Sequence, residues 1–144
     1  MATIKDILSK KGREVYHTHP DATVLSALRI MADRGVGALV VLDDGHLAGI
    51  ITERDYARKV VLMGRTSPAT LVKEIMSPKV ICARLDQTVE ECMAVMTARM
   101  VRHLPVLDHK SVVGVVSIGD LVKCIIADKS FIIAQLEHYI QGGR

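Results

Sequence analysis

The sequence has few of the features on which disulfide-stabilised or membrane-spanning proteins depend. Aromatic residues make up 3% of its 144 residues, with one Phe and no Trp, so we expect a core of aliphatic side chains. The three cysteines, Cys82, Cys92 and Cys124, are odd in number and have no C-x-x-C spacing. This usage is typical of a reducing compartment rather than of a disulfide framework.

Long apolar runs and blocks of one charge are missing as well. No apolar run approaches the roughly 18 residues that a membrane-spanning helix needs, and the N-terminus lacks the apolar stretch of a signal peptide. The formal net charge is +3, with basic residues interleaved among acidic ones. We therefore expect a cytoplasmic protein with no membrane partner, and nothing in the charge pattern supports nucleic-acid binding.

The most informative positive feature is an internal repeat. Residues 15–60 align with residues 80–125 at a constant offset of 65 without a gap, and 13 of the 46 pairs are identical. A shorter lead-in also recurs, because IKDIL at 4–8 resembles VKEIM at 72–76. We predict repeats at 1–66 and 67–128 and a C-terminal helix and tail at 129–144. Binding clefts are expected between the two packed repeats.

Each repeat has the pattern of a βαββα unit, which predicts an α/β fold. Apolar spacing over residues 23–34 indicates a helix with Thr23 as its N-cap, and Thr88 with Glu91 has capping-box spacing at the matching helix. Two apolar runs around a turn signal follow in each repeat, at 38–51 and 103–116, and predict hairpins. Their near-continuous apolar character favours sheets that are covered on both faces.

Three further expectations concern packing. Pro105 has no N–H to donate, so its strand should lie at a sheet edge or pair on one side only. A terminal amphipathic helix is predicted over residues 131–140, and its apolar face requires either this chain's own surface or a second subunit. Four methionines on helical faces are expected to fill the core: Met31, Met93, Met96 and Met100.

A motif of the form G-x-x-[ST]-x-x-D ends the last strand of each repeat, as GIITERD at 49–55 and GVVSIGD at 114–120. A helix that begins there offers backbone N–H groups to a phosphate, and a hydroxyl can donate to the same anion. A carboxylate one turn later can accept from two ribose hydroxyls. Thr52 or Ser117 would therefore contact phosphate or ribose, and Asp55 or Asp120 would hold the ribose.

The same spacing has a structural interpretation. Thr52 with Asp55, and Ser117 with Asp120, are placed as in a capping box and could serve only to begin a helix. Spacing alone supports both interpretations equally. They are compatible, since a capped helix can still present its remaining donors.

The repeat, the paired motifs, the strand RHLPV at 102–106 and the lead-in KEIM at 73–76 together resemble a tandem pair of cystathionine-β-synthase (CBS) domains. The resemblance covers almost the whole chain and looks like a small stand-alone bacterial protein of this kind. It implies a disc-like Bateman module with pseudo-two-fold symmetry and two clefts, which often dimerises. It also implies adenosine-containing ligands: AMP, ADP, ATP, S-adenosylmethionine or NAD.

The resemblance also implies roles for particular residues. Thr52, Asp55, Ser117 and Asp120 take the positions whose hydroxyl and carboxylate contact phosphate and ribose in the family. The base would be enclosed by residues of the first strand and of the start of the hairpin, which are His17, Thr18, Gly37, Ala38, Cys82, Ala83, Arg102, His103 and Pro105.

The two motifs differ in charge. Arg54 gives the first motif a cation where the second has Gly119, so the first site is expected to suit a polyphosphate or dinucleotide better. Arg58 and Lys59 follow it, but a solvated helix face is the favoured interpretation for those two. His17 and His19 lie on an extended segment without a third ligand, which favours surface residues over a metal site.

No nucleophile with a base, metal-ligand cluster or P-loop is present in the sequence, so we expect neither an enzyme nor a catalytic cofactor. The leading hypothesis is a regulatory module that binds an adenosine-containing nucleotide between its repeats and forms a homodimer. The alternative is a dimerising protein-interaction module with degenerate nucleotide sites.

Overall fold

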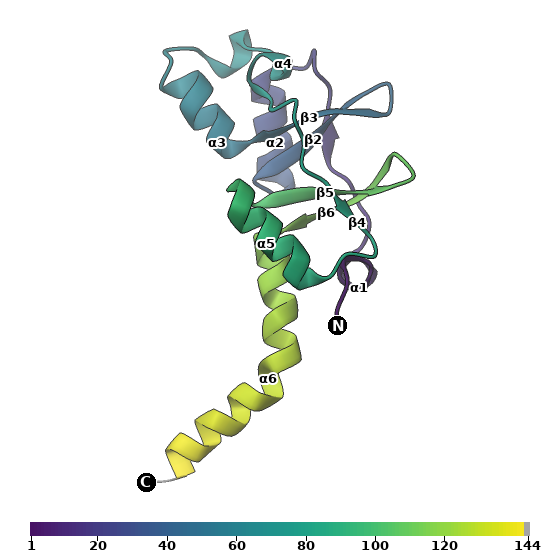
Figure 1. Cartoon of the computed structure of the whole chain (residues 1–144). Coiled ribbons are helices and arrows are strands. Elements are labelled where there is room, and N and C mark those ends of the chain that lie inside the picture. The colour runs from purple at the N-terminus through teal and green to yellow at the C-terminus, as the bar shows by residue number, and fades with distance from the viewer. Residues whose placement is uncertain (143–144) are drawn as a thin grey trace.

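The computed structural model describes residues 1–142, with side chains described for all of these except 128–133, 135, 139, 141 and 142. The chain forms two sheet-and-helix units that lie next to each other, and a long helix that extends away from them (Figure 1). Within the described residues, no helix combines the length and the apolar character needed to span a bilayer.

The first unit follows the expected order. Its elements are α1 (Ile4–Lys11), β1 (His17–Thr18), α2 (Val24–Arg34), β2 (Ala38–Asp43), β3 (His46–Thr52) and α3 (Glu53–Tyr56), which continues into the π-helical turn η1 (Ala57–Val61). The second unit has η2 (Ser67–Ala69, a 3₁₀ turn), α4 (Val72–Ile75), β4 (Ala83–Arg84), α5 (Val89–Arg99), β5 (His103–Asp108), β6 (Ser111–Ser117) and α6 (Ile118–Gly142). The predicted βαββα units and α/β class are confirmed.

The two sheets are built to the same plan. Their strand orders are β1-β2-β3 and β4-β5-β6, with a parallel first pair and an antiparallel hairpin. Ala38 pairs with Thr52 in one hairpin and His103 pairs with Ser117 in the other, and both hairpins shift register at the same relative position. The offset of 65 therefore describes the backbone as well as the sequence.

Local signals begin the helices where the sequence predicts. The Thr23 hydroxyl accepts from the Ser26 amide at 3.1 Å, and the Thr88 hydroxyl accepts from the Glu91 amide at 3.1 Å. The Thr88 amide donates in return to Glu91 at 3.5 Å, which completes the capping box. These contacts hold α2 and α5 at the same place in the two repeats.

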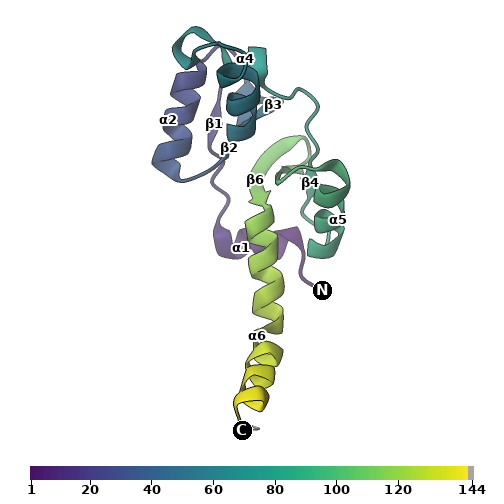
Figure 2. The same cartoon turned by 90° about the vertical axis from the view of Figure 1, so that its left-hand side faces the viewer.

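Each repeat has its own core, and each core includes the lead-in helix of the other. Ile4, Ile7 and Leu8 of α1 pack in the core of the second repeat, whereas Val72 and Ile75 of α4 pack in the core of the first. In the side view of Figure 2, α1 lies beside α5 and the start of α6. The lead-ins are thus exchanged between repeats.

Backbone hydrogen bonds reproduce this exchange at both places. The Ile4 amide donates to Gln87 at 2.9 Å and the Val89 amide donates to Ala2 at 3.1 Å. At the other end of the molecule, the Val72 amide donates to Ala22 and the Val24 amide donates to Thr70, both at 2.8 Å. Each lead-in is therefore tied to the residues just before a repeat's first long helix.

The glycine of each motif is the point where a lead-in meets a strand. A Cβ on Gly49 would lie 2.8 Å from the Ser77 carbonyl oxygen and 2.9 Å from Met76 Sδ. A Cβ on Gly114 would lie 2.8 Å from two methyl carbons of Leu8. Ser77 also exchanges backbone hydrogen bonds with Ile50, at 2.9 and 3.1 Å, and so extends the edge of the sheet at β3.

Pro105 is not in an edge strand, because β5 is the central strand of its sheet. The alternative prediction applies to the residue itself: Pro105 is paired with Val115 of β6, and the pairing with β4 begins only at Val106. In the first repeat the matching Val40 amide donates at 3.3 Å to the carbonyl of Tyr16, the residue just before the parallel strand β1. Pro105 lacks this donor, and the β4 pairing starts one residue later.

Two other expectations need correction. Met31, Met93 and Met96 pack in or against the cores, but Met100 is 79% exposed, because it follows α5 in the left-handed conformation (φ 55°) and points out of the helical face. The motif helix of the second repeat and the predicted terminal helix are one continuous element, α6, since no helix-breaking residue separates them. Residues 131–140 thus extend a helix that begins inside the second repeat.

Gly49→Ala should destabilise the protein by about 1–3 kcal/mol, because the new methyl group overlaps the backbone of Ser77, which cannot move without the lead-in. Urea unfolding measures the change. Gly119→Ala is the matched control, since its Cβ would lie an ordinary 3.6 Å from Ser117 Oγ. Both substitutions reduce the entropy of the unfolded chain alike. Equal stability of the two variants would contradict the close approach at Gly49.

Candidate functional site

A cavity of about 480 Å³ lies between the two repeats. Gly37, Ile50, Thr52, Glu53, Arg54, Asp55 and Ser77 line it from the first repeat and the linker, and Met100, Val101, Arg102 and His103 line it from the second. Six predicted site residues thus meet here from segments about 50 residues apart in sequence: Gly37, Thr52, Arg54, Asp55, Arg102 and His103.

The first motif forms a complete capping box at the edge of this cavity. Asp55 Oδ2 accepts from the Thr52 amide at 2.9 Å and from the Thr52 hydroxyl at 3.1 Å, and the Asp55 amide donates back to that hydroxyl at 3.1 Å. The capping interpretation of the motif is therefore realised. Asp55 is buried at 9% exposure, yet it still lines the cavity.

The other oxygen of Asp55 is paired with a lysine. Lys59 Nζ lies 3.1 Å from Asp55 Oδ1 and donates to the Ile75 carbonyl at 2.9 Å. Lys59 is exposed, as the favoured interpretation of a solvated helix face predicts, and its ammonium group also links the motif to α4. The i,i+4 spacing of Asp55 and Lys59 is the sequence signal that indicates the pair.

Glu53 is an acidic residue in the cavity that sequence reasoning missed. Its amide donates to the Gly37 carbonyl at 3.0 Å, and its Oε1 lies 2.8 Å from where a Cβ on Gly37 would be. In the equivalent hydrogen bond of the second repeat, the Ile118 amide donates to the Arg102 carbonyl at 2.9 Å. Glu53 therefore occupies the room left by the missing side chain at residue 37.

His103 lies within reach of both motifs. Burial lowers its pKa below the usual value, and the positive charges of Lys11 and Arg102 act in the same direction. Asp120 and Glu53 oppose the shift. His103 is consequently held neutral in a setting where an anion bound nearby would favour its protonated form.

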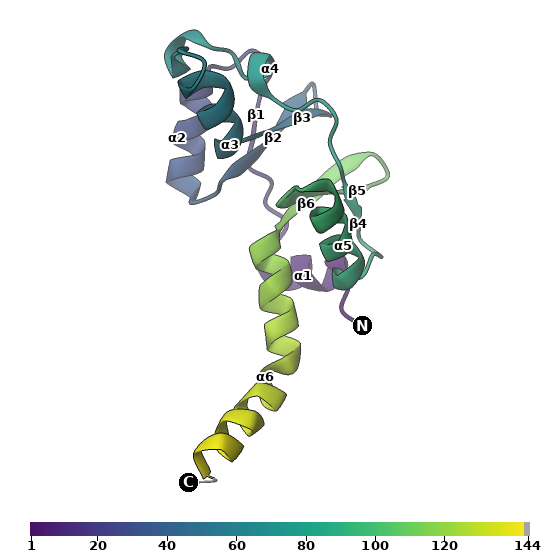
Figure 3. The same ribbon diagram turned by 60° about the vertical axis from the view of Figure 1, so that its left-hand side comes forward.

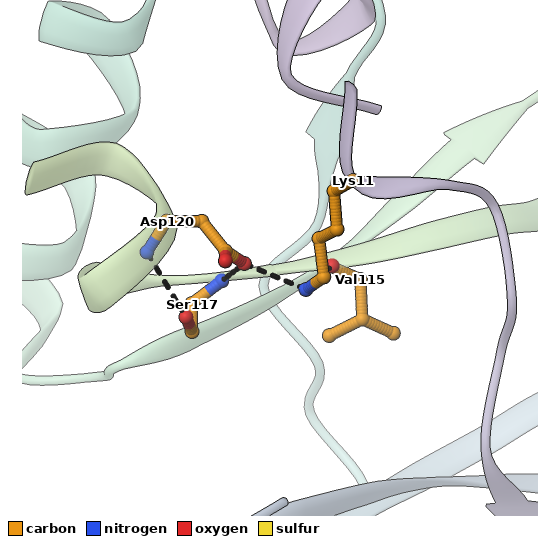
Figure 4. Close-up of polar contacts among 4 residues, drawn as sticks. All are labelled: Lys11, Val115, Ser117 and Asp120. Carbon is orange, nitrogen blue, oxygen red and sulfur yellow. Dashed lines mark hydrogen bonds and ion pairs between the residues drawn. The ribbon is translucent and has the colours of Figure 1, made fainter. Parts of the chain in front are cut away.

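The second motif has the same cap but a different cation (Figure 4). Asp120 Oδ2 accepts from the Ser117 amide at 2.8 Å, and the Asp120 amide donates to Ser117 Oγ at 3.2 Å. Lys11, the last residue of α1, places its Nζ 2.6 Å from Asp120 Oδ2 and 2.7 Å from the Val115 carbonyl oxygen. A residue of the exchanged lead-in thus takes the place that Lys59 has in the first motif.

Asp120 remains ionised more readily than an ordinary aspartate. Burial works against its charge, but the hydrogen bonds from Lys11 and from the Ser117 amide outweigh burial, so its pKa is lowered. Asp120 and Lys11 line a second cavity, of about 910 Å³, which lies between α1 and α6 rather than with Arg102 and His103. The two motifs therefore open onto different surroundings.

The remaining predicted residues line neither of these two cavities. Thr18, Ala83 and Pro105 are buried in strands, His17 is exposed, and Ala38 and Cys82 are half-buried. Ser117 is half-buried beside Asp120. Their contacts with a ligand stay predictions that rest on the resemblance.

Several lining residues were not found by sequence reasoning. Lys11 is about 105 residues from the groups it contacts, so only the exchange of lead-ins reveals it. Met100 reaches the cavity through its left-handed backbone, and Ser77 through its pairing with β3. Among the side chains that the structure describes, no group of three or more His, Cys, Asp or Glu is placed to hold a metal ion.

Comparison with known proteins gives a consistent result. The family model of the CBS domain matches residues 3–62 and 72–127. The chain is 40% identical over 150 residues to the CBS domain-containing protein CBSX3, mitochondrial, of Arabidopsis thaliana, an alignment covering 98% of this chain and 73% of that protein. It is 31% identical to the CBS domain-containing protein YhcV of Bacillus subtilis, with 84% of each chain covered.

Solved structures show the same architecture. A protein with CBS domains from Burkholderia ambifaria superposes with a TM-score of 0.86 at 50% identity, over 89% of this chain and 96% of that one. The CBS domain pair of protein MJ0100, in complex with 5′-methylthioadenosine and S-adenosyl-L-methionine, has a TM-score of 0.80 at 27% identity, over 90% and 99% of the two chains.

Lys11→Met should raise the pKa of Asp120, because the hydrogen bond and the positive charge that oppose burial are both removed. A pH titration of the carboxyl ¹³C shift of Asp120 measures the change. Lys10→Met is the control, as it removes the same charge from the adjacent residue, which makes no hydrogen bond to Asp120 among those described.

The same substitution should alter stability in acid. Because the folded-state pKa of Asp120 is lowered, its contribution is present above the unfolded value of about 3.9 and is lost as pH falls through the folded pKa. Lys11→Met should therefore make the acid limb of stability against pH shallower than in Lys10→Met. Identical titrations of Asp120 in the two variants would contradict the role of Lys11.

Proposed function

Since the chain belongs to the CBS-domain family, as a tandem pair of such domains, we propose that it is a regulatory module that binds an adenosine-containing nucleotide between its repeats. The bound 5′-methylthioadenosine and S-adenosyl-L-methionine of the MJ0100 domain pair support this ligand class. AMP, ADP, ATP and NAD are the candidate ligands, and each has the phosphate groups that the site described below would bind.

The observation that carries the proposal is the meeting of cations from both repeats in the cavity of about 480 Å³. Arg54 comes from the first repeat, and Arg102 and His103 come from the second. Guanidinium groups bind phosphate through two parallel hydrogen bonds. A phosphate placed among these side chains would neutralise the guanidinium groups of Arg54 and Arg102, and it would also favour the protonated form of His103.

Asp55 would hold the ribose in this proposal. Its Oδ1 accepts from Lys59, and a carboxylate oxygen can accept more than one hydrogen bond. The capping box already holds the carboxylate in place, so a ribose hydroxyl meets an acceptor that does not need to be reoriented. The cap and the binding role are then two uses of one side chain.

The cavity of about 480 Å³, at the first motif, would be the main nucleotide site. The second motif has Gly119 in place of Arg54, and Lys11 occupies the carboxylate that would otherwise take the ribose. A ligand at Ser117 and Asp120 would have to displace Lys11 or share Asp120 with it. One nucleotide per chain is therefore the expected stoichiometry at moderate concentration.

Regulation would follow from the position of the ligand. A nucleotide that contacts both repeats has different affinities for different arrangements of the repeats, and so shifts their populations. In this proposal the chain acts as a cytoplasmic homodimer that senses its ligand, and it catalyses no reaction of its own.

A dimerising interaction module with degenerate nucleotide sites is the second candidate. The exposed apolar side chains of α6 favour it, because they offer a surface for another protein. Removal of residues 131–144 separates the two functions. Loss of dimerisation or partner capture with unchanged nucleotide binding would show that this surface has a function of its own.

Calorimetric titration with AMP, ADP, ATP, NAD, NADH and S-adenosylmethionine tests the nucleotide proposal. Arg54→Ala should weaken binding of the preferred phosphate-bearing ligand about tenfold, since one charge-assisted contact is lost. Arg58→Ala is the matched control, because it removes the same charge from an exposed residue that does not line the cavity.

Asp55→Asn and Asp120→Asn distinguish binding at the first motif from binding at the second. Binding should be weakened by the change at residue 55 and little altered by the change at residue 120. Circular dichroism of each variant verifies that the capped helices remain. If none of the six ligands binds to the wild-type protein, the nucleotide proposal is wrong and the interaction module is the better account.

A further inference from the structure

The C-terminal half of α6 extends away from both repeats in all three views (Figures 1, 2 and 3). At the start of the helix, Leu121 is fully buried, and Ile118 and Ile125 pack against the core of the second repeat. None of the described apolar side chains of α6 beyond Ile125 packs against either core. A helix of this kind is marginally stable in water without tertiary contacts, which indicates that a partner covers it.

Among the described side chains of α6, four large apolar ones are exposed: Val122 (38%), Ile126 (53%), Leu136 (58%) and Ile140 (65%). Val122 and Ile126 are four residues apart, as are Leu136 and Ile140, and the ten residues between the two pairs equal three, four and three. This is the alternating spacing that brings side chains to one face of a helix and forms a coiled-coil seam. Leu121 and Ile125 belong to a neighbouring face, which contacts this chain's own core. The exposed residues therefore form a separate seam, called the α6 seam below.

We infer that the α6 seam pairs with the α6 seam of a second copy of this chain, in the antiparallel direction. The spacing of apolar residues along the seam is the same when it is followed in either direction. When two copies run antiparallel about position 131, Val122 lies opposite Ile140 and Ile126 lies opposite Leu136, because both pairs are centred on that position. Each of the four seam residues then lies opposite another of the four.

Charge supports the same register. Lys123 and Glu137 are both exposed, and each follows a seam residue directly. They occupy matching flanking positions of the seven-residue pattern, which face each other in an antiparallel pair. Lys123 of each copy would therefore lie next to Glu137 of the other, and the two-fold symmetry produces this ion pair twice.

A parallel pair has no such complementarity. Residues with the same number lie at the same level there, so Lys123 and Glu137 of the two copies would be separated by 14 residues, or about 21 Å along the axis. The same distance prevents the two side chains from meeting within one chain. Any coupling between them must therefore be intermolecular.

This inference gives a surface and a direction to the homodimer proposed above. It does not depend on the nucleotide site, because no residue of the seam lines the cavity between the repeats. Failure of the nucleotide proposal would leave it unchanged.

Sedimentation equilibrium of the full chain over a range of concentrations tests the seam. Leu136→Glu puts a charge into the seam of both copies and should raise the dimer dissociation constant at least about a hundredfold. His138→Glu is the matched control, since it adds an acidic group to an exposed position two residues along the same helix but off the seam. It should leave the dissociation constant within about threefold.

A charge exchange tests the direction. Lys123→Glu and Glu137→Lys should each weaken the dimer roughly tenfold, because two like-charge pairs replace two ion pairs. The double variant should regain the wild-type constant, and the gain should diminish in 1 M salt. A monomeric wild-type protein would overturn the inference, as would a dimer that Leu136→Glu does not weaken. A double variant no tighter than the single ones would overturn the antiparallel register.

Discussion

The structure depends on the exchange of the two lead-in helices. Each repeat alone has a small three-stranded sheet with helices on one face, and its core is completed by a segment that precedes the other repeat in sequence. The exchange needs glycine at residue 49, where a Cβ would overlap the backbone of Ser77, whereas at Gly114 a Cβ would meet the flexible end of the Leu8 side chain. It joins the repeats into one unit, with the first motif at the cavity between them and the second at the cavity between α1 and α6.

The exchange also makes the two motifs chemically different. Both present a capped aspartate that is paired with a lysine. In the first, the lysine comes from the next turn of the same helix, and Arg54 lines the adjoining cavity. In the second, the lysine is Lys11, the last residue of the exchanged helix α1. The pKa of Asp120 therefore depends on the position of α1. Pseudo-symmetry of the backbone therefore does not imply two equivalent binding sites.

The motif glycine and the motif aspartate act at different levels. Gly49 and Gly114 allow close packing of the lead-ins, whereas Asp55 and Asp120 hold the first turns of their helices. Because Asp55 serves folding first, its presence alone does not establish a binding role. The cations that accompany it in the cavity, Arg54 from one repeat and Arg102 from the other, are the feature that a capping role leaves unexplained.

Local and periodic features were determined by the sequence alone. The repeat offset, the caps at Thr23 and Thr88, and the two hairpins depend on residues close together in the chain, and all are confirmed. Tertiary structure decided the rest. It places β5, which contains Pro105, at the centre of its sheet, it exposes Met100, and it brings Lys11 into contact with Asp120. These features depend on which distant segment packs beside a residue. A local sequence pattern contains no information about the exchange of lead-in helices that brings those segments together.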